Sequence, residues 1–163
     1  IADSGPKGLS EHWNEHVDPH VAHYEHYFVA LDMENSHWNE GAGESATLFG
    51  VTEWYIAPGK GADFNAMKEK MSTMAKEKGW ANEERNWLWS ERIGGKPVAS
   101  IVSPYENYSD MAPPEVTFYE FAVEQLGEEE ADKMFETFSK SASASKYTLW
   151  RHIPELSMSD EDE

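Results

Sequence analysis

From residue 47 onward, two kinds of apolar pattern alternate along this chain, and their order limits the folds that it can adopt. Runs rich in β-branched and aromatic residues, typical of strands, cover residues 47–57, 86–93, 97–103 and 146–153. Apolar residues at helical spacing lie between them, in residues 63–79, 115–126 and 131–142. The order is therefore strand, helix, strand, strand, helical region, strand.

The breaks between these segments carry residues that suit turns. Residues 58–61 close the first strand with proline and glycine, and Gly94-Gly95 joins the second and third strands. Glycine tolerates the positive φ of a hairpin turn, so we expect these two strands to pair antiparallel. The whole order predicts an α+β domain of the split βαβ, ferredoxin-like type, with a four-stranded antiparallel sheet and helices on one face.

Both faces of the predicted strands carry large apolar residues. Counting by twos places Trp54 with Thr52 and Ile56 on one face of the first strand, and Trp87 with Trp89 on one face of the second. Helices cover only one face of such a sheet. The other face should not meet water either, so something else must cover it.

The first 45 residues have a different composition from the rest of the chain. They hold nine acidic residues against one basic residue, and six of the seven histidines lie before residue 38. Ser10 suits the N-cap of a short helical turn to His16, and Asp18-Pro19 suits a helix start. The apolar residues that follow at helical spacing are Val21, Tyr24, Phe28 and Leu31. This spacing predicts an amphipathic helix over 19–34 and a loop over 35–45.

The chain is thereby expected to have three parts. Residues 1–45 form an acidic, His-rich helical extension, residues 46–156 the ferredoxin-like domain, and residues 157–163 a solvated acidic tail. The acidic residues outnumber the basic ones by 31 to 13, for a net charge of −18. This charge excludes a nucleic-acid binder or a protein that docks on anionic lipid, because both need a cationic surface. No segment approaches the roughly 20 apolar residues that cross a bilayer.

The absence of cysteine excludes a disulfide framework, a thiolate metal site and a cysteine nucleophile. The chain opens on Ile1 and not on Met, which indicates a processed or trimmed product. We therefore expect a secreted or periplasmic protein, and a cytoplasmic one stays compatible with both observations.

Three segments resemble the dimeric α+β barrel superfamily, which includes antibiotic biosynthesis monooxygenase-like and NIPSNAP-like domains. Residues 51–64 resemble the first strand and its Pro-Gly-Lys turn, residues 103–111 the third strand leaving for its loop, and residues 149–157 the closing strand. The resemblance covers residues 47–157. It implies a homodimer whose two sheets pack face to face, with a ligand pocket between each sheet and its helices.

Five residues on or directly after the predicted strands are candidates for the wall of a ligand pocket. They are Trp54, Trp89, Tyr105, Trp150 and His152. The aromatic residues are equally suited to a core or to a dimer interface. His152 is suited either to a general base or to a hydrogen-bonded structural position.

A second candidate site lies in the extension. His20, His23 and His26 step by three residues along the predicted helix, so neighbouring imidazoles could converge on zinc, copper or nickel. The alternative interpretation is a polar helix face, because the spacing matches no compact zinc motif.

These observations favour a small-molecule-binding protein with an aromatic pocket, and they leave its activity open. One alternative is an oxygenase or isomerase of the same superfamily that acts on an aromatic or polyketide-like compound. Another is a structural or assembly protein whose acidic extension mediates contacts between subunits. The sequence pattern identifies no cofactor and no catalytic residue.

Overall fold

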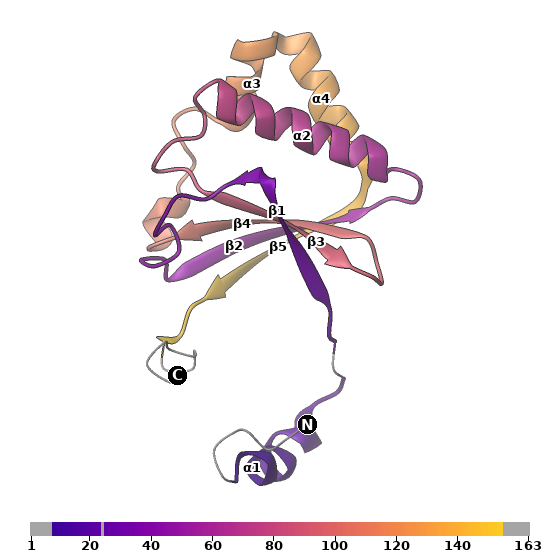
Figure 1. Ribbon diagram of the computed structural model, residues 1–163, viewed down its shortest axis with the longest axis vertical. Coiled ribbons are helices and arrows are strands. Elements are labelled where there is room, and N and C mark those ends of the chain that lie inside the picture. Colours follow the sequence, from indigo (N-terminus) through magenta and orange to yellow (C-terminus); the bar gives the residue numbers. More distant parts are fainter. Residues whose placement is uncertain (1–7, 24, 155–163) are drawn as a thin grey trace.

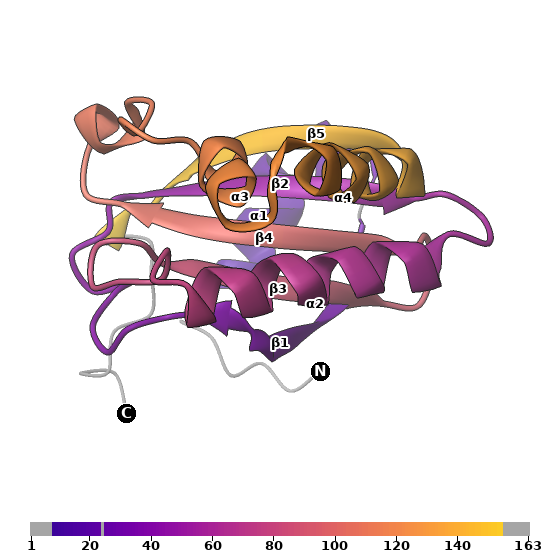
Figure 2. The same cartoon turned by 90° about the horizontal axis from the view of Figure 1, so that it is seen from above.

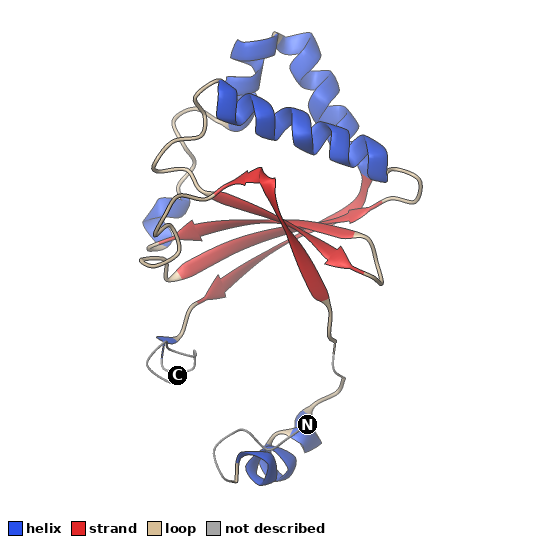
Figure 3. Cartoon of the chain, viewed as in Figure 1, coloured by secondary structure: helices blue, strands red, loops and turns tan. Residues whose placement is uncertain are grey.

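The computed structural model describes residues 8–23 and 25–154 of the chain. They form an α+β fold around one five-stranded antiparallel sheet with the strand order β1-β3-β4-β2-β5. Figure 3 shows the strands as one layer and the three longer helices as a second layer on one side of it. The acidic tail expected over 157–163 lies outside the described residues.

The strands are β1 (Phe28–His37), β2 (Leu48–Ile56), β3 (Trp87–Ile93), β4 (Val98–Tyr105) and β5 (Ala142–Arg151). The α-helices are α1 (Leu9–His16), α2 (Gly61–Glu77), α3 (Phe118–Leu126) and α4 (Glu128–Ser141), and two short 3-10 turns are η1 (Asp18–His20) and η2 (Tyr108–Met111). None of the helices in the described part of the chain is long and apolar enough to span a membrane.

From residue 47 onward, the predicted elements are present in the predicted order. The hairpin of β3 and β4 turns at Gly94 and Gly95, whose φ values are 78° and 67°. Helix α2 begins at Gly61, two residues before the predicted start at Asp63, with Lys60 as its N-cap residue. Figure 2 looks through α2, α3 and α4 onto the sheet, so these helices cover a single face.

The helix predicted over 19–34 is wrong, and the sheet has five strands and not four. Among the described residues of this region, only Asp18–His20 is helical, as a 3-10 turn, and Phe28 begins strand β1. Strand β1 pairs antiparallel with β3, for example Phe28 with Ile93 and Asp32 with Trp89. A helix at this position would leave the outer edge of β3 without backbone partners, and pairing with β1 satisfies those groups.

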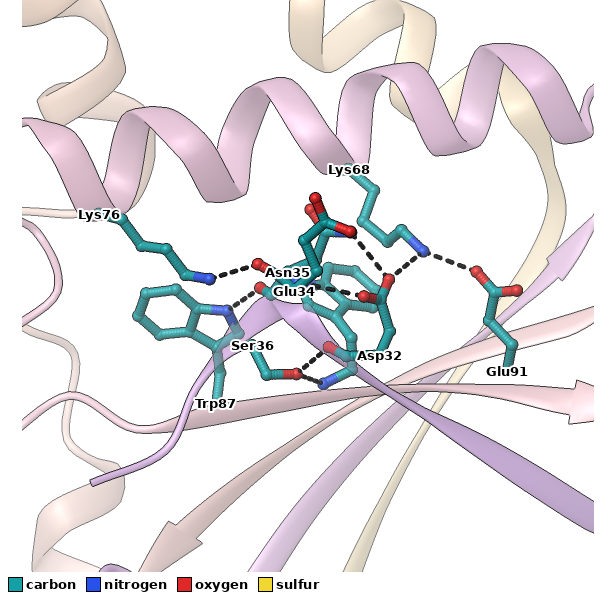
Figure 4. A network of polar contacts seen from close by, with 9 residues as sticks. Asp32, Glu34, Asn35, Ser36, Lys68, Lys76, Trp87 and Glu91 are labelled. Carbon is teal, nitrogen blue, oxygen red and sulfur yellow. Dashed lines mark hydrogen bonds and ion pairs between the residues drawn. The ribbon is translucent and has the colours of Figure 1, made fainter. Parts of the chain in front are cut away.

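A polar cluster below α2 holds β1 against the helix layer (Figure 4). The ammonium of Lys68, only 3% exposed, lies 2.7 Å from the Asp32 carboxylate and 2.6 Å from the Glu91 carboxylate. Burial alone would raise the pKa of Asp32, but hydrogen bonds from Lys68 and Asn35 outweigh it and lower this pKa. Burial likewise disfavours the charged lysine, yet its two carboxylate partners raise the Lys68 pKa. Lys68 is therefore the shared cation of the two carboxylates, and its charge offsets the repulsion between them.

Side chains of α2, α4 and the sheet form the apolar core. Phe64 of α2 is fully buried, and its ring centroid lies 4.7 Å from that of Phe138 and 6.2 Å from that of Trp54. Met134 of α4 is 1% exposed and belongs, with Met71 of α2, to a second cluster of buried apolar residues. These contacts fix the distance between helices and sheet.

The N-terminal segment stands apart from this core. We call residues 8–23 and 25–27 the arm. Figures 1 and 2 place its helix α1 on the side of the sheet opposite α2, α3 and α4. Every residue of α1 is exposed. The arm therefore contributes nothing to the core that α2 and α4 form with the sheet.

Candidate functional site

A cavity of about 1070 Å³ lies between the helix-facing side of the sheet and the helix layer. Strands β2, β3 and β4 form its floor, α2 forms one wall and α3 and α4 form the other. The loops at residues 42–46, 83–86 and 106–114 surround its mouth. We call it the sheet–helix cavity.

The register of three neighbouring strands assembles the floor. Thr52 of β2 lies opposite Ile101 of β4, and Ile101 lies opposite Trp89 of β3, so these positions point to the same side. Trp54 follows two residues after Thr52, and its ring centroid lies 5.3 Å from that of Trp89. The floor is consequently aromatic and aliphatic.

The helix walls add further apolar groups. Met71, Ser72 and Ala75 face the cavity from α2, and all three are buried. Aromatic residues complete the opposite wall and the end near the mouth: Trp80, Phe118, Phe135 and Phe138. Trp80 and Phe118 meet edge to face with ring centroids 5.2 Å apart. Such walls suit an apolar guest, and the Ser72 hydroxyl adds one polar group among them.

Gly50 of β2 makes room for two tyrosines beside the cavity. A Cβ atom at this position would lie 2.5 Å from the Tyr147 hydroxyl oxygen and 2.9 Å from Cε2 of Tyr105. Burial raises the pKa of Tyr147, and the neighbouring Tyr105, through charge and a hydrogen bond, raises it further. Tyr105 also lines the cavity, so the absence of a side chain at Gly50 sets where this wall lies.

Charged groups gather at the mouth of the cavity. The Arg85 guanidinium lies 4.0 Å from the ring centroid of Trp80, and its Nη1 donates to the Trp80 carbonyl oxygen at 3.2 Å. Asp110 accepts hydrogen bonds from the backbone N–H groups of Glu106 and Asn107, both at 3.0 Å. The mouth is thus polar and locally ordered, while the interior is apolar.

The structure brings three of the five predicted pocket residues together. Trp54, Trp89 and Tyr105 line the sheet–helix cavity. Trp150 lies opposite Phe49 in the register, which places it on the other face of the sheet, where it is 62% exposed. His152 follows the end of β5 and is exposed, and its backbone N–H donates to the Thr47 carbonyl oxygen at 2.8 Å. These two residues are not part of the cavity.

The metal hypothesis for His20, His23 and His26 loses its geometric basis. It depended on helical steps of three residues, and only His20 lies in a helical turn, η1. Within residues 8–23 and 25–154, no group of three or more histidine and acidic side chains is arranged to hold a metal ion.

Sequence reasoning missed the residues that the helices and loops contribute to the cavity. Phe135 and Phe138 stand at helical spacing, which indicates a buried face but not that it is left partly unfilled. Trp80 lies in a loop after α2, where no periodicity marks it. These positions become a wall only when α2, α3 and α4 pack together over the sheet.

Within the part of the chain that the structure describes, no helix layer covers the opposite side of the sheet (Figure 1). We call this side the open face and define it by the residues whose side chains alternate away from the cavity: Val29, Leu31, Phe49, Val51, Glu53, Tyr55, Leu88, Ser90, Arg92, Val98, Ser100, Val102, Lys146, Thr148 and Trp150. Val29 is 47% exposed and Leu31 57% exposed. Most of the open face is therefore apolar and partly or fully exposed.

Comparison with known proteins identifies no relative of this chain. No family model, no curated protein and no solved structure matches the chain.

Proposed function

We propose that this protein binds an apolar small molecule with an aromatic ring system in the sheet–helix cavity. The observation that carries the proposal is the cavity itself, about 1070 Å³ in volume with an aromatic interior and a polar mouth. Ligand pockets of proteins typically have volumes of roughly 300–1,000 Å³ and mostly apolar walls with a few polar groups.

The chemistry of the walls favours this class of ligand. Trp54 and Trp89 on the floor, with Phe118, Phe135 and Phe138 opposite, offer ring faces and edges on which a planar ring can stack. Met71 adds a polarisable, adaptable side chain. A bound aromatic compound would replace water in contact with these groups, which is favourable.

We place the domain in the ferredoxin-like arrangement and propose that it forms a homodimer of the dimeric α+β barrel type. Four of its strands stand in the order β5-β2-β4-β3, and α2 connects β2 with β3. Strand β1 is an addition at the β3 edge. The exposed apolar residues of the open face support a cover by a second sheet.

No observation favours the oxygenase or isomerase alternative. The residue considered as a base, His152, lies outside the cavity, and no histidine is among the described residues that line it. We therefore propose binding and no reaction.

A fluorescence titration tests the binding proposal. The neutral probe N-phenyl-1-naphthylamine should bind saturably, quench tryptophan emission and gain emission by energy transfer from Trp54 and Trp89. The variant Ser103→Phe places a ring in the cavity, because Ser103 lies opposite Gly50 on the helix-facing side of the sheet. We expect this variant to fold and to lose at least tenfold in affinity for the probe.

The matched control is Ser145→Phe. Ser145 lies on the same side of the sheet, opposite Trp54, but it is exposed and lies outside the cavity lining. This variant should bind the probe as the unchanged protein does. Equal loss in both variants, or no saturable binding by the unchanged protein, would overturn the proposal.

Light scattering tests the dimer separately. The unchanged protein should have twice the chain mass of 18.5 kDa. Leu31→Glu adds a charge to the open face, because Leu31 is 57% exposed there, and should produce monomers. A monomeric mass of the unchanged protein at high concentration contradicts the dimer and leaves the cavity proposal standing.

A further inference from the structure

The end of the arm next to β1, residues 25–27, contacts the open face of the sheet; we call these residues the root of the arm. Arg92 of β3 lies on this face, and its guanidinium is 3.2 Å from the Glu25 carboxylate and 3.4 Å from the Glu53 carboxylate. The Tyr27 ring stacks on the same guanidinium, with 3.8 Å between Cζ and the ring centroid. These contacts direct the chain that precedes β1 towards the open-face side.

Beyond this root, the arm leaves its own sheet. Figure 1 shows α1 on the open-face side and separated from the strands, and Figure 2 shows it beyond the sheet when viewed from the helix layer. Packing of α1 within its own chain is mainly with the neighbouring turn η1. The apolar residues Leu9 and Trp13 of α1 are 52% and 43% exposed, one helical turn apart on the same side.

A helix of this kind requires a surface to pack on. Helix α1 has eight residues, and no side chain caps its N-terminus. Isolated helices shorter than about 12–15 residues are marginal in water, so most of their stability must come from packing. Its own sheet does not provide that packing.

The charge of the open face favours a second copy of this chain as the occupant. The protein carries a net charge of −18, which opposes self-association over most of its surface. The charged residues that define the open face are only Glu53, Arg92 and Lys146, one acidic and two basic. These few charges leave little repulsion between the open faces of two copies.

We infer that each copy extends its arm to the other copy in a face-to-face dimer and packs Leu9 and Trp13 of α1 on the partner chain. The inference rests on the homodimer proposed above and goes beyond it, because the arm then holds the two subunits together reciprocally. The ion pair of Arg92 with Glu25 and the stacking of Tyr27 on Arg92 set the direction of the arm. The arm is thus an assembly element and not part of the ligand cavity.

Paramagnetic relaxation in mixed dimers tests this inference directly. The chain has no cysteine, so Ser10→Cys, on the exposed helix α1, takes a single nitroxide label. This labelled chain at natural isotope abundance is mixed with unmodified chain enriched in ¹⁵N. We expect broadening of amide signals within residues 48–151 of the enriched chain, and none with the diamagnetic analogue of the label.

The possible outcomes distinguish a failure of the arm inference from a failure of the dimer proposal. A dimeric mass with broadening only when the nitroxide and ¹⁵N are in the same chain overturns the inference and leaves the dimer standing. A monomeric mass at NMR concentration overturns both, and the probe titration of the cavity is unaffected by either result.

Side-chain truncation provides a second readout. Changing Leu9 and Trp13 together to alanine should weaken dimerisation at least tenfold in a dilution series by analytical ultracentrifugation. Asn14→Ala, on another side of the same helix, should leave the dissociation constant unchanged. Because α1 lies outside the core, neither variant should unfold the domain, and equal dissociation constants for both variants contradict the inference.

Discussion

The two faces of the sheet present the same kinds of side chain in opposite situations. On the helix-facing side, Trp89 is 5% exposed and Ala99 fully buried, yet the helices leave a cavity of about 1070 Å³ above the floor. On the open face, Leu31 and Trp150 are more than half exposed, and the described chain places no layer over them. One face is covered but incompletely filled, and the other is uncovered.

This difference is the basis of the two proposals. In the first, a small molecule occupies the cavity with the aromatic interior, which needs no change of the fold. In the second, the sheet of another copy covers the exposed apolar face, since sheets pack face to face at about 10 Å. The same sheet would thereby serve ligand binding on one side and assembly on the other.

The largest expected effect comes from removing the ring that joins the helix layer to the covered face. Phe64→Ala should destabilise the protein by about 3–5 kcal/mol, because Phe64 is fully buried and its ring contacts Phe138. Urea unfolding followed by circular dichroism measures the loss. Phe28→Ala makes the same change at a residue that is 80% exposed and should cost no more than about 0.5 kcal/mol. Similar losses for both variants would contradict the described core.

A smaller effect should follow from breaking the charge cluster that joins β1 to α2. Lys68→Met keeps the packing volume but leaves Asp32 and Glu91 without their cation, at a cost of about 2 kcal/mol. Lys70→Met, on the same helix, removes only an exposed pair at 3.7 Å from Glu130 and should cost less than about 1 kcal/mol. Urea midpoints compare the two, and an equal cost would show that the cluster does not hold β1.

The same cluster predicts a dependence of stability on acid. The pKa of Asp32 is lowered from 3.8 in the folded protein, so its contribution is present above pH 3.8 and is lost as the pH falls through the folded pKa. Asp32→Asn should therefore flatten the loss of unfolding free energy below about pH 4. An unchanged slope in urea titrations between pH 2 and pH 6, roughly the carboxylate range, would exclude this origin.

The smallest expected effect concerns the tyrosine wall beside the cavity. Gly50→Ala would bring Cβ to 2.5 Å from the Tyr147 hydroxyl, and the two tyrosines must move aside at a cost of about 1–2 kcal/mol. Gly61→Ala is the control, because nothing lies within 4 Å of its added Cβ. Thermal unfolding gives the two costs, and the probe titration should show weaker binding only for Gly50→Ala.

The secondary structure from residue 47 onward is largely predictable from the sequence, because the spacing of apolar residues in each segment fits only one type of element. In residues 63–79 the methionines recur only at helical spacing, and Gly94-Gly95 marks the hairpin directly. Strand β1 was missed because both of its faces are apolar. Phe28 and Ala30 face one side and Val29 and Leu31 the other, so the alternation of a half-buried strand is hidden.

In the candidate site too, the local sequence pattern predicts the position of some residues, while the position of others depends on contacts between segments distant in the sequence. Trp54 and Trp89 lie on strands that the local pattern predicts, and Tyr105 directly follows a third predicted strand. Trp150 was misplaced because its face depends on the register of β5 against Phe49, and this register is set by pairing across the sheet. The helix wall depends on how α2, α3 and α4 pack, which no local pattern contains.

Methionine methyl groups offer the most direct test of the central claim that the covered face binds the ligand. Met71 and Met111 line the cavity, whereas Met33 on β1 is 58% exposed and lies outside it. With ¹³C-labelled methionine methyls, the probe N-phenyl-1-naphthylamine should shift Met71 and Met111 saturably and leave Met33 in place. Shifts at Met33 with Met71 and Met111 unmoved would place the ligand outside the cavity and contradict the account.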